Sequence, residues 1–206
     1  MTFQFNTVFE YWPMYLEGLR TTIYVTLGSL IFSLILSIPL AMIKITKNKI
    51  LNFIGFLYTD IFRALPSLVQ IYLVYFAAPQ LFGITFTAMT SAFITLSMNA
   101  AAYISEALRG GILSVDIGQR EAAKALGISQ VDTLKDIVLP QALKAVFPSM
   151  INETIGLLKG TSLVSIIGVV DLMRASRQVM ADSYLSFEPL MVAAVIYYIL
   201  VKSMSM

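Results

Sequence analysis

Long apolar segments alternate with short polar ones along this chain, a pattern that predicts a helical membrane protein. A helix needs roughly 20 apolar residues to cross a bilayer core of about 30 Å. Five segments are expected to cross: Thr21 to Ile43, Leu51 to Phe82, Ile84 to Leu108, Ala142 to Leu158 and Leu185 to Val201. The apolar segment Leu163 to Val170 is too short and is expected to be a half-helix or an interfacial piece. We therefore predict an all-α membrane protein of about five transmembrane helices in a single domain, residues 1–206.

Lysine and arginine gather in two of the connecting loops, and this predicts the orientation of the chain. Lys44, Lys47 and Lys49 lie between the first two expected spans, and further basic residues lie around the loop between the third and fourth. Short cytoplasmic loops carry an excess of Lys and Arg, so both loops are expected in the cytoplasm and the N-terminus outside. Arg174 and Arg177 are exceptions on the outer side.

The composition supports the membrane class and excludes several chemistries. The chain of 206 residues is 58% hydrophobic and 13% charged, with a mean hydropathy of +0.80, whereas soluble domains are about a quarter charged. A net charge of +2 without a basic patch argues against nucleic-acid binding. The chain has no cysteine and no histidine, so no thiolate nucleophile, imidazole base or metal site is predicted.

The most patterned polar segment runs from about residue 110 to 140, between the third and fourth expected spans. Residues 121–126 are rich in helix formers, and Gly127 can end that helix in a left-handed conformation. Ser129 and Asp132 form a capping-box-like start for a second helix. The pattern alone predicts a bent pair of short helices, either a plain amphipathic connector or a surface that touches a soluble partner.

The spacing in this segment resembles the EAA loop of the permease subunits of bacterial ABC importers. Seven residues stand at the family positions: Glu121, Ala122, Ala123, Gly127, Ile137, Leu139 and Pro140. Other segments are similar to permeases of the histidine/glutamine/arginine type, which carry polar amino acids: residues 62–70, 101–106, 109–112 and 139–142. Ala64 and Leu65 depart from that pattern, in which Gly and Thr are common at these positions.

The resemblance implies a type I ABC importer permease fold with cytoplasmic coupling helices, in the bacterial plasma (inner) membrane. It implies a second permease subunit, identical or related, and ABC ATPase subunits that dock on the EAA loops. It also implies an extracellular or periplasmic substrate-binding protein that delivers a polar amino acid. This chain lacks the G-x-x-x-x-G-K-[ST] phosphate loop. We therefore expect it to be no enzyme and to hold no cofactor, with ATP and Mg²⁺ bound by the partner ATPase.

Polar residues inside the expected spans are the candidate substrate contacts. A charge at the bilayer centre costs at least about 2.5–3.5 kcal/mol, so such groups should face protein or water. Glu153 has no basic residue three or four positions away. Its carboxylate could receive the ammonium group of an amino acid or pair with Arg63 on another helix. With the resemblance added, the candidate substrate-binding set is Arg63, Gln70, Asn99, Tyr103, Glu153 and Lys159.

Several alternatives stay open at this point. Asp60 could pair with Arg63, and Glu106 with Arg109, because each pair is three positions apart on one helix. The substrate could be an amino acid derivative such as cystine or an opine. A channel or carrier without an ATPase would explain the spans but not the EAA-like loop. A membrane enzyme would need a nucleophile–base or metal constellation, which this sequence does not offer.

Overall fold

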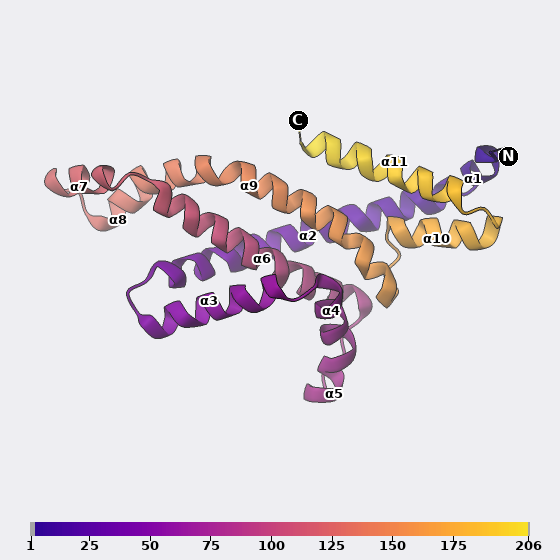
Figure 1. Cartoon of the computed structure of the whole chain (residues 1–206), viewed down its shortest axis with the longest axis horizontal. Helices are drawn as coiled ribbons and strands as arrows, with labels where there is room; N and C mark the ends of the chain where they lie inside the picture. Colours follow the sequence, from indigo (N-terminus) through magenta and orange to yellow (C-terminus); the bar gives the residue numbers. More distant parts are fainter. Residues whose placement is uncertain (1–2, 206) are drawn as a thin grey trace. The chain divides into compact units, whose positions relative to one another are not determined.

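The computed structural model describes residues 3–205, and within this range the ordered elements are helices joined by short turns, without strands. The predicted all-α class is therefore confirmed. The chain divides into two compact units. The first comprises Met1–Ile31, Leu65–Ser97 and Thr154–Met206, and the second comprises Phe32–Ala64 and Met98–Glu153. Helices α2, α6 and α9 each contribute residues to both units (Figure 1).

The first unit packs the N-terminal helices against the C-terminal ones. Its elements are α1 (Phe5–Phe9), the start of α2 (Trp12–Ile45), α4 (Ser67–Tyr72), η1 (Leu73–Ala77), α5 (Ala78–Phe82), the start of α6 (Ala88–Ser114), the end of α9 (Leu139–Gly160), η3 (Thr161–Ile167), α10 (Leu172–Ser183) and α11 (Phe187–Met204). A buried cluster joins α1, α2, α10 and α11 through Val8, Tyr15, Leu172, Val179 and Ala193. The Tyr15 hydroxyl donates to the Pro189 carbonyl at 3.1 Å.

The second unit carries the polar loop that stood out in the sequence. Its elements are the end of α2, α3 (Lys49–Ala64), the end of α6, α7 (Ile117–Ala125), α8 (Gln130–Asp132), η2 (Thr133–Val138) and the start of α9. Helices α7 and α8 lie at the end of this unit where α6 stops and α9 begins (Figure 1). A small core of Ile112, Val138 and Ala142 fastens them to α6 and α9.

Helix α2 has hydroxyl groups on its buried side and large apolar groups on its exposed side. The buried residues recur every three or four positions: Thr22, Thr26, Ser29, Ser33 and Ser37. The exposed ones between them are large and apolar: Ile23, Leu27, Ile31, Ile35 and Ile38. Small residues at this spacing let membrane helices approach closely. Helices α2 and α11 are each long and apolar enough to span a membrane alone.

The expected second span, residues 51–82, is not one straight helix. Helix α3 and the segment Ser67–Phe82 are bent by 105° at the residues between them. Pro66 causes the break, because it has no N–H and because it disfavours helical geometry at Leu65. The Gln70 side chain donates to the Leu65 carbonyl at 2.8 Å and so satisfies an acceptor that the break leaves open.

A second bent pair joins Gln130–Ile167 to Leu172–Ser183 at 50°, and counting both pairs gives up to four candidate spans within residues 3–205. The expected third span begins four residues before α6 and otherwise lies in it, and the expected fourth lies within α9. The short apolar segment 163–170 forms most of the 3₁₀-helix η3, which ends at Gly168 with φ +101°. It is therefore a short helical piece, as its length indicated.

Two π-helical stretches, η1 and η2, each end two residues before a proline, which is the second residue of the α-helix that follows. These are Pro79 after η1 and Pro140 after η2. A proline in a helix removes the N–H that would bond four residues back, and its ring crowds that carbonyl. The wider π turn relieves this crowding. Pro140 therefore fits the start of α9, as predicted, but it widens the turn that precedes it.

Candidate functional site

The hairpin formed by α7 and α8 is held in shape by caps on both helices. Asp116 begins α7 by accepting from the Gly118 N–H at 2.6 Å, so the helix starts earlier than residue 121. At its other end the Gly127 N–H donates to the Lys124 carbonyl at 3.1 Å, and the Ile128 N–H donates to the Ala123 carbonyl at 3.0 Å. These two bonds form a Schellman motif. Gly127 has φ +75°, which confirms the predicted left-handed end.

The second helix of the hairpin begins as its sequence predicts. The Ser129 hydroxyl oxygen accepts from the Asp132 N–H at 3.1 Å, and the hydroxyl donates to the Asp132 carboxylate at 2.6 Å. Both bonds are local, within three residues, so they need no tertiary support. The predicted serine N-cap is confirmed, but the Asp132 carboxylate accepts from the Ser129 hydroxyl and not from its backbone N–H, so the capping box is incomplete.

The EAA-like residues fall into two groups by exposure. Ala123 is buried, and Ile137 is partly buried. The exposed members are Glu121, Ala122, Gly127, Leu139 and Pro140. The Ala123 methyl therefore serves packing within the chain, whereas the Glu121 side of the hairpin is free. The coupling role of all seven residues stays a prediction.

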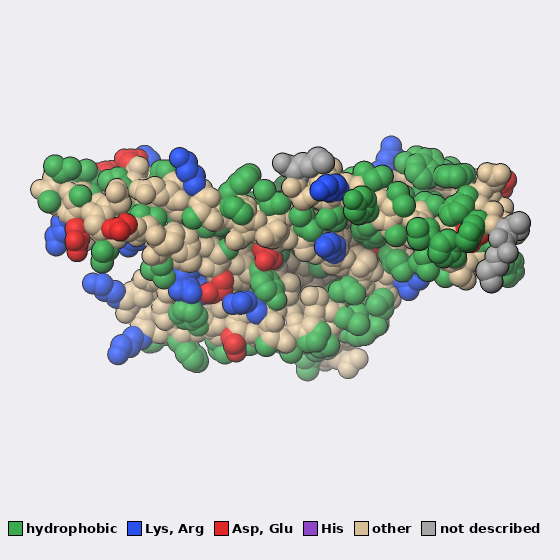
Figure 2. Space-filling model, turned by 45° about the horizontal axis from the view of Figure 1, so that its top comes forward, with side chains coloured by type: hydrophobic (Ala, Val, Ile, Leu, Met, Phe, Trp, Pro, Cys, Tyr) green, Lys and Arg blue, Asp and Glu red, His purple; other side chains and the backbone are tan. Residues whose placement is uncertain are grey.

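Large apolar side chains stand exposed on the same hairpin. The exposed fractions are 71% for Ile117, 79% for Leu126 and 72% for Val131. On the face shown in Figure 2, charged and apolar side chains alternate over α7 and α8. These three apolar side chains are therefore available for contact with another protein.

Four of the six predicted substrate residues belong to the second unit: Arg63, Asn99, Tyr103 and Glu153. The Arg63 guanidinium lies over the Tyr103 ring, 5.3 Å from its centroid. Glu153 on α9 lies near enough to Arg63 for their charges to interact, but the two form no ion pair within 4.0 Å in the part of the chain that the structure describes. The Asn99 amide donates to the Phe62 carbonyl at 3.1 Å, so it joins α6 to α3. These residues bring a cation, an acid and an aromatic ring together from three helices.

Gln70 and Lys159, the other two predicted substrate residues, belong to the first unit. Gln70 is buried and its amide is engaged at the break before α4. Lys159 is exposed near the end of α9. The structure gives Gln70 a clear role in supporting the chain at Pro66, and the substrate role of both residues stays a prediction.

The expected Asp60–Arg63 pair does not form. Among residues 3–205 the ion pairs within 4.0 Å are those of Glu106, with Lys44 and with Arg109. Asp60 and Arg63 both line an open pocket of about 430 Å³ along α3, together with Glu106 and aromatic side chains of α3. Both residues are exposed within the chain, and the Arg63 guanidinium lies over the Tyr103 ring instead.

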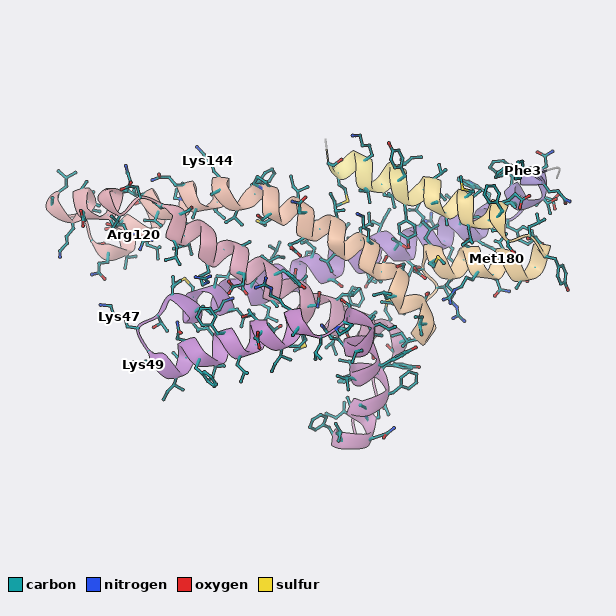
Figure 3. All side chains as sticks on the ribbon, in the orientation of Figure 1. Phe3, Lys47, Lys49, Arg120, Lys144 and Met180 are labelled. Atoms are coloured by element: carbon teal, nitrogen blue, oxygen red, sulfur yellow. The ribbon has the colours of Figure 1, made fainter. Side chains whose placement is uncertain are left out.

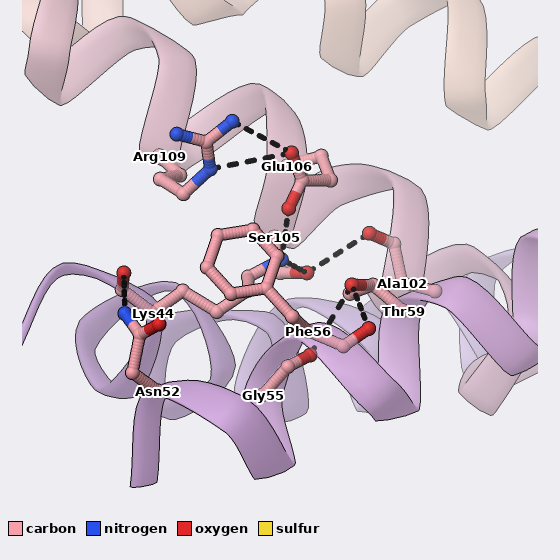
Figure 4. Close-up of polar contacts among 9 residues, drawn as sticks. All are labelled: Lys44, Asn52, Gly55, Phe56, Thr59, Ala102, Ser105, Glu106 and Arg109. Atoms are coloured by element: carbon pink, nitrogen blue, oxygen red, sulfur yellow. Dashed lines mark hydrogen bonds and ion pairs between the residues drawn. The ribbon is translucent and has the colours of Figure 1, made fainter. Parts of the chain in front are cut away.

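A cluster of charged residues joins α2, α3 and α6 (Figure 4). The Glu106 carboxylate accepts from Lys44 Nζ at 2.6 Å and from Arg109 Nη2 at 3.0 Å, which confirms the expected Glu106–Arg109 pair. Lys44 Nζ also donates to the Ser105 hydroxyl at 2.8 Å. The Phe56 ring centroid lies 6.0 Å from Lys44 Nζ and 5.5 Å from the Arg109 guanidinium.

No partner for Lys44 was predicted, and its only predicted role was in orienting the chain. Its side chain is 0% exposed. A signal was present, because Lys44 continues the three-to-four residue spacing of the buried positions Ser33, Ser37 and Ala41 on α2. Lys47 and Lys49 do project from the α2–α3 turn, toward the same end of the unit as Arg120 in the hairpin (Figure 3). The orientation of these loops in a membrane stays a prediction.

Comparison with known proteins supplies relatives over almost the whole chain. The family model described as the inner membrane component of binding-protein-dependent transport systems matches residues 33–205. A putative glutamine transport system permease protein, GlnP, of Rickettsia bellii is 44% identical over 189 residues, which is 92% of this chain and 87% of that protein. The arginine transport system permease protein ArtQ of Bacillus subtilis is 41% identical over 201 residues, 98% of this chain and 92% of that protein.

Solved structures match the same fold. A chain in the crystal structure of an amino acid ABC transporter with histidines has a TM-score of 0.94 and 33% identity, covering 100% of this chain and 95% of that one. A chain of the inward-facing MetNI methionine ABC transporter has a TM-score of 0.79 at 20% identity, covering 93% and 91%. The second likeness concerns the fold alone, and both confirm the architecture expected from the sequence.

Proposed function

We propose, because this chain belongs to the family of binding-protein-dependent transport system inner membrane components, that it is the transmembrane subunit of an ATP-driven importer of polar amino acids. A separate ABC ATPase hydrolyses ATP and drives the spans between outward-open and inward-open states. A second permease subunit, identical or related, completes the path. A binding protein delivers substrate from outside.

The structure of the hairpin supports the proposed coupling to an ATPase. Helix α7 is capped at both ends, and Ala123 and Val138 are buried at its base. The opposite side exposes Glu121 and Leu126. A displacement of the exposed side is therefore transmitted to α6 and α9, because no flexible loop lies between them and the hairpin. When an ATPase bound to the Glu121 side changes conformation, it moves α6 and α9, the two helices that carry Tyr103 and Glu153.

The substrate part rests on the cluster of Arg63, Tyr103 and Glu153. A free amino acid carries a carboxylate and an ammonium group, and the cluster offers an arginine and a glutamate on different helices. Arg63 binds the carboxylate and Glu153 binds the ammonium or a cationic side chain. The names of the relatives, a glutamine and an arginine permease protein, agree with a polar amino acid. Cystine or an opine is the alternative cargo of the same importer class.

Exchange of Gly127 for aspartate tests the docking claim. The variant forces a charged L-residue into a left-handed position at the hairpin tip, and we expect loss of ATPase co-purification and of uptake with the spans still inserted. Gly83→Asp is the matched control, because Gly83 also has a left-handed φ of +68° and nothing within 4 Å of an added Cβ. Normal co-purification and uptake with Gly127→Asp would show that the hairpin is not the docking element.

Exchange of Glu153 for glutamine tests the substrate claim. We expect uptake to fall or its selectivity to change while the ATPase still co-purifies. Glu17→Gln removes an exposed carboxylate from the start of α2 and serves as the control. Uptake by proteoliposomes should be compared across the common amino acids, cystine and an opine. Equal selectivity and rate for Glu153→Gln and wild type would remove Glu153 from the site.

A further inference from the structure

A pocket of about 380 Å³ opens inside the hairpin, between α7 on one side and α8 with η2 on the other. Three aliphatic side chains form part of its wall, and four polar ones face it: Arg120, Lys124, Gln130 and Thr133. None of these polar residues is among the EAA-like positions. The pocket is therefore a feature of the hairpin that the family spacing does not describe.

The pocket is positively charged and rich in hydrogen-bond donors. Two cationic residues line it, and no acidic residue does. Arg120 Nη2 donates to the Ile112 carbonyl at 2.8 Å, but Arg120 Nε is buried and has no acceptor among residues 3–205. Within the same range, neither the Lys124 ammonium nor the Gln130 amide has a hydrogen-bond or ion-pair partner. The Lys124 ammonium and the Gln130 amide are therefore the groups open to an anion in the pocket, and the Arg120 guanidinium adds positive charge beside them.

The surroundings of the pocket indicate that a protein covers it. Leu126 and Val131 at the hairpin tip are 79% and 72% exposed, and Ile128 in the pocket wall is 38% exposed. A small anion from solution would bind the charges but would leave these apolar side chains in water. A protein surface with an acidic side chain satisfies both, since carboxylates form strong bonds with guanidinium and ammonium groups.

We propose that this pocket receives one carboxylate side chain of the ATPase subunit, held by Lys124 and Arg120, with Gln130 and Thr133 beside it. This inference rests on the proposed docking of an ATPase on the hairpin. It adds a point of attachment inside the hairpin to the exposed Glu121 side. It also assigns the positive charge of α7 to partner binding and not only to solubility.

The test measures the affinity of the ATPase for the full-length permease purified in detergent, together with its partner permease where that is a different chain. Lys124→Gln should weaken binding at least about tenfold, the scale of a lost desolvated charge pair. Lys135→Gln is the matched control, because Lys135 is an exposed lysine of η2 that does not line the pocket. It should leave the affinity nearly unchanged. Equal effects of the two variants would overturn the proposal.

Charge reversal then identifies the partner residue. Lys124→Glu should abolish binding, and one acidic-to-lysine exchange in a scan of the ATPase surface should restore it. If no exchange restores binding while Lys124→Gln alone is harmful, a carboxylate is not the occupant. Failure of Gly127→Asp to disturb docking would instead contradict the proposed function itself, so the two failures are distinguishable.

Inorganic phosphate serves as a probe of the alternative occupant. If phosphate raises the melting temperature of the wild-type subunit but not of Lys124→Gln, and the ATPase binds both equally, then the pocket is a small-anion site and the proposal is wrong. If the proposal holds, the ATPase affinity of the wild type falls more steeply with ionic strength than that of Lys124→Gln, because one attractive charge pair is then absent.

Discussion

Exchange of Glu106 for glutamine is expected to destabilise the second unit more than exchange of either cationic partner. Glu106 holds Lys44 at 2.6 Å and Arg109 at 3.0 Å. Glu106→Gln leaves two positive groups facing each other, and the Lys44 side chain has no exposed surface. Lys44→Met removes one positive group, keeps the aliphatic volume and leaves the Glu106–Arg109 pair intact.

The magnitude follows from distance and exposure. At 2.6 Å and an effective dielectric constant of about 20, the attraction between unit charges is about 6 kcal/mol before desolvation is subtracted. Removing one partner of a buried pair typically costs about 3–5 kcal/mol, and we expect Glu106→Gln to fall in this range. The Glu106 and Arg109 side chains are 20% and 28% exposed, so their pair is partly screened. Lys44→Met should therefore cost only about 1–2 kcal/mol.

Unfolding of the purified full-length chain in mixed micelles, as the mole fraction of SDS rises, measures these differences by circular dichroism. Lys47→Met is the control, since Lys47 is an exposed lysine close to Lys44 in sequence. The double variant Lys44→Met/Glu106→Gln should lose less than the sum of the single losses, because the unpaired buried ammonium is gone. If Lys44→Met proves as harmful as Glu106→Gln, Glu106 is not the centre of the cluster and the reasoning fails.

Three further changes have expected outcomes. Gly127→Ala, at φ +75°, should strain the hairpin by about 1–2 kcal/mol and raise the ATP hydrolysed per amino acid taken up by proteoliposomes; an unchanged ratio contradicts this. Tyr103→Phe keeps a ring under the guanidinium and should transport almost normally, whereas Tyr103→Ala should slow initial uptake; equal rates would remove the ring from the site. Gly111→Ala would drive a methyl into Val146 and should cost about 1–3 kcal/mol in the SDS assay. Gly110→Ala has open space and should cost less; equal losses refute the packing argument.

The hairpin could be predicted in detail because its signals are local. A left-handed glycine and a serine cap depend on residues within six positions, and both Gly127 and Ser129 behave in the structure as the sequence indicates. The apolar segments likewise predicted α2, α6, α9 and α11. The apolar length that a membrane span needs does not depend on which helices pack against it. These features need no knowledge of which helices touch.

The bend at Pro66 shows why hydropathy alone misplaces a span. Residues 51–82 are apolar on both sides of the proline, so a window of average hydropathy runs through it without a break. The backbone bends at this point because Pro66 has no N–H and because a residue before proline, here Leu65, disfavours helical geometry. Gln70 then supports the break by bonding the Leu65 carbonyl, a role that its position among the polar intramembrane residues did not indicate.

The partners of the charged residues could not be predicted because they lie on other helices. The spacing on one helix suggested that Arg63 could pair with Asp60. In the structure, however, the Arg63 guanidinium lies over Tyr103 of α6. The spacing also suggested a pair between Glu106 and Arg109, and this pair is present. It could not reveal Lys44 as the second partner of Glu106, because the two residues are 62 positions apart in the chain. Choice among possible partners depends on which helices approach each other, and a periodic pattern fixes only which side of each helix is buried.

Helix α6 connects the charged cluster, the candidate substrate residues and the hairpin within one unit. Tyr103, Glu106 and Arg109 follow one another along it, and α6 ends at Ser114, two residues before the cap of α7. From Tyr103 to Ser114 a helix rises about 16 Å. The pair Gly110–Gly111 is the least stable part of this stretch of α6, since glycine lowers helix stability.

Packing compensates for that weak point. A Cβ added at Gly111 would meet the Val146 side chain and the Ala142 carbonyl of α9, so the two helices are in close contact where α6 is least stiff. A displacement of the hairpin cannot bend α6 there without also moving α9. Because α9 carries Glu153 and α6 carries Tyr103, both candidate substrate contacts then move with the hairpin. Under the proposed mechanism, the close approach at Gly111 is what turns movement of the ATPase into a change at the substrate.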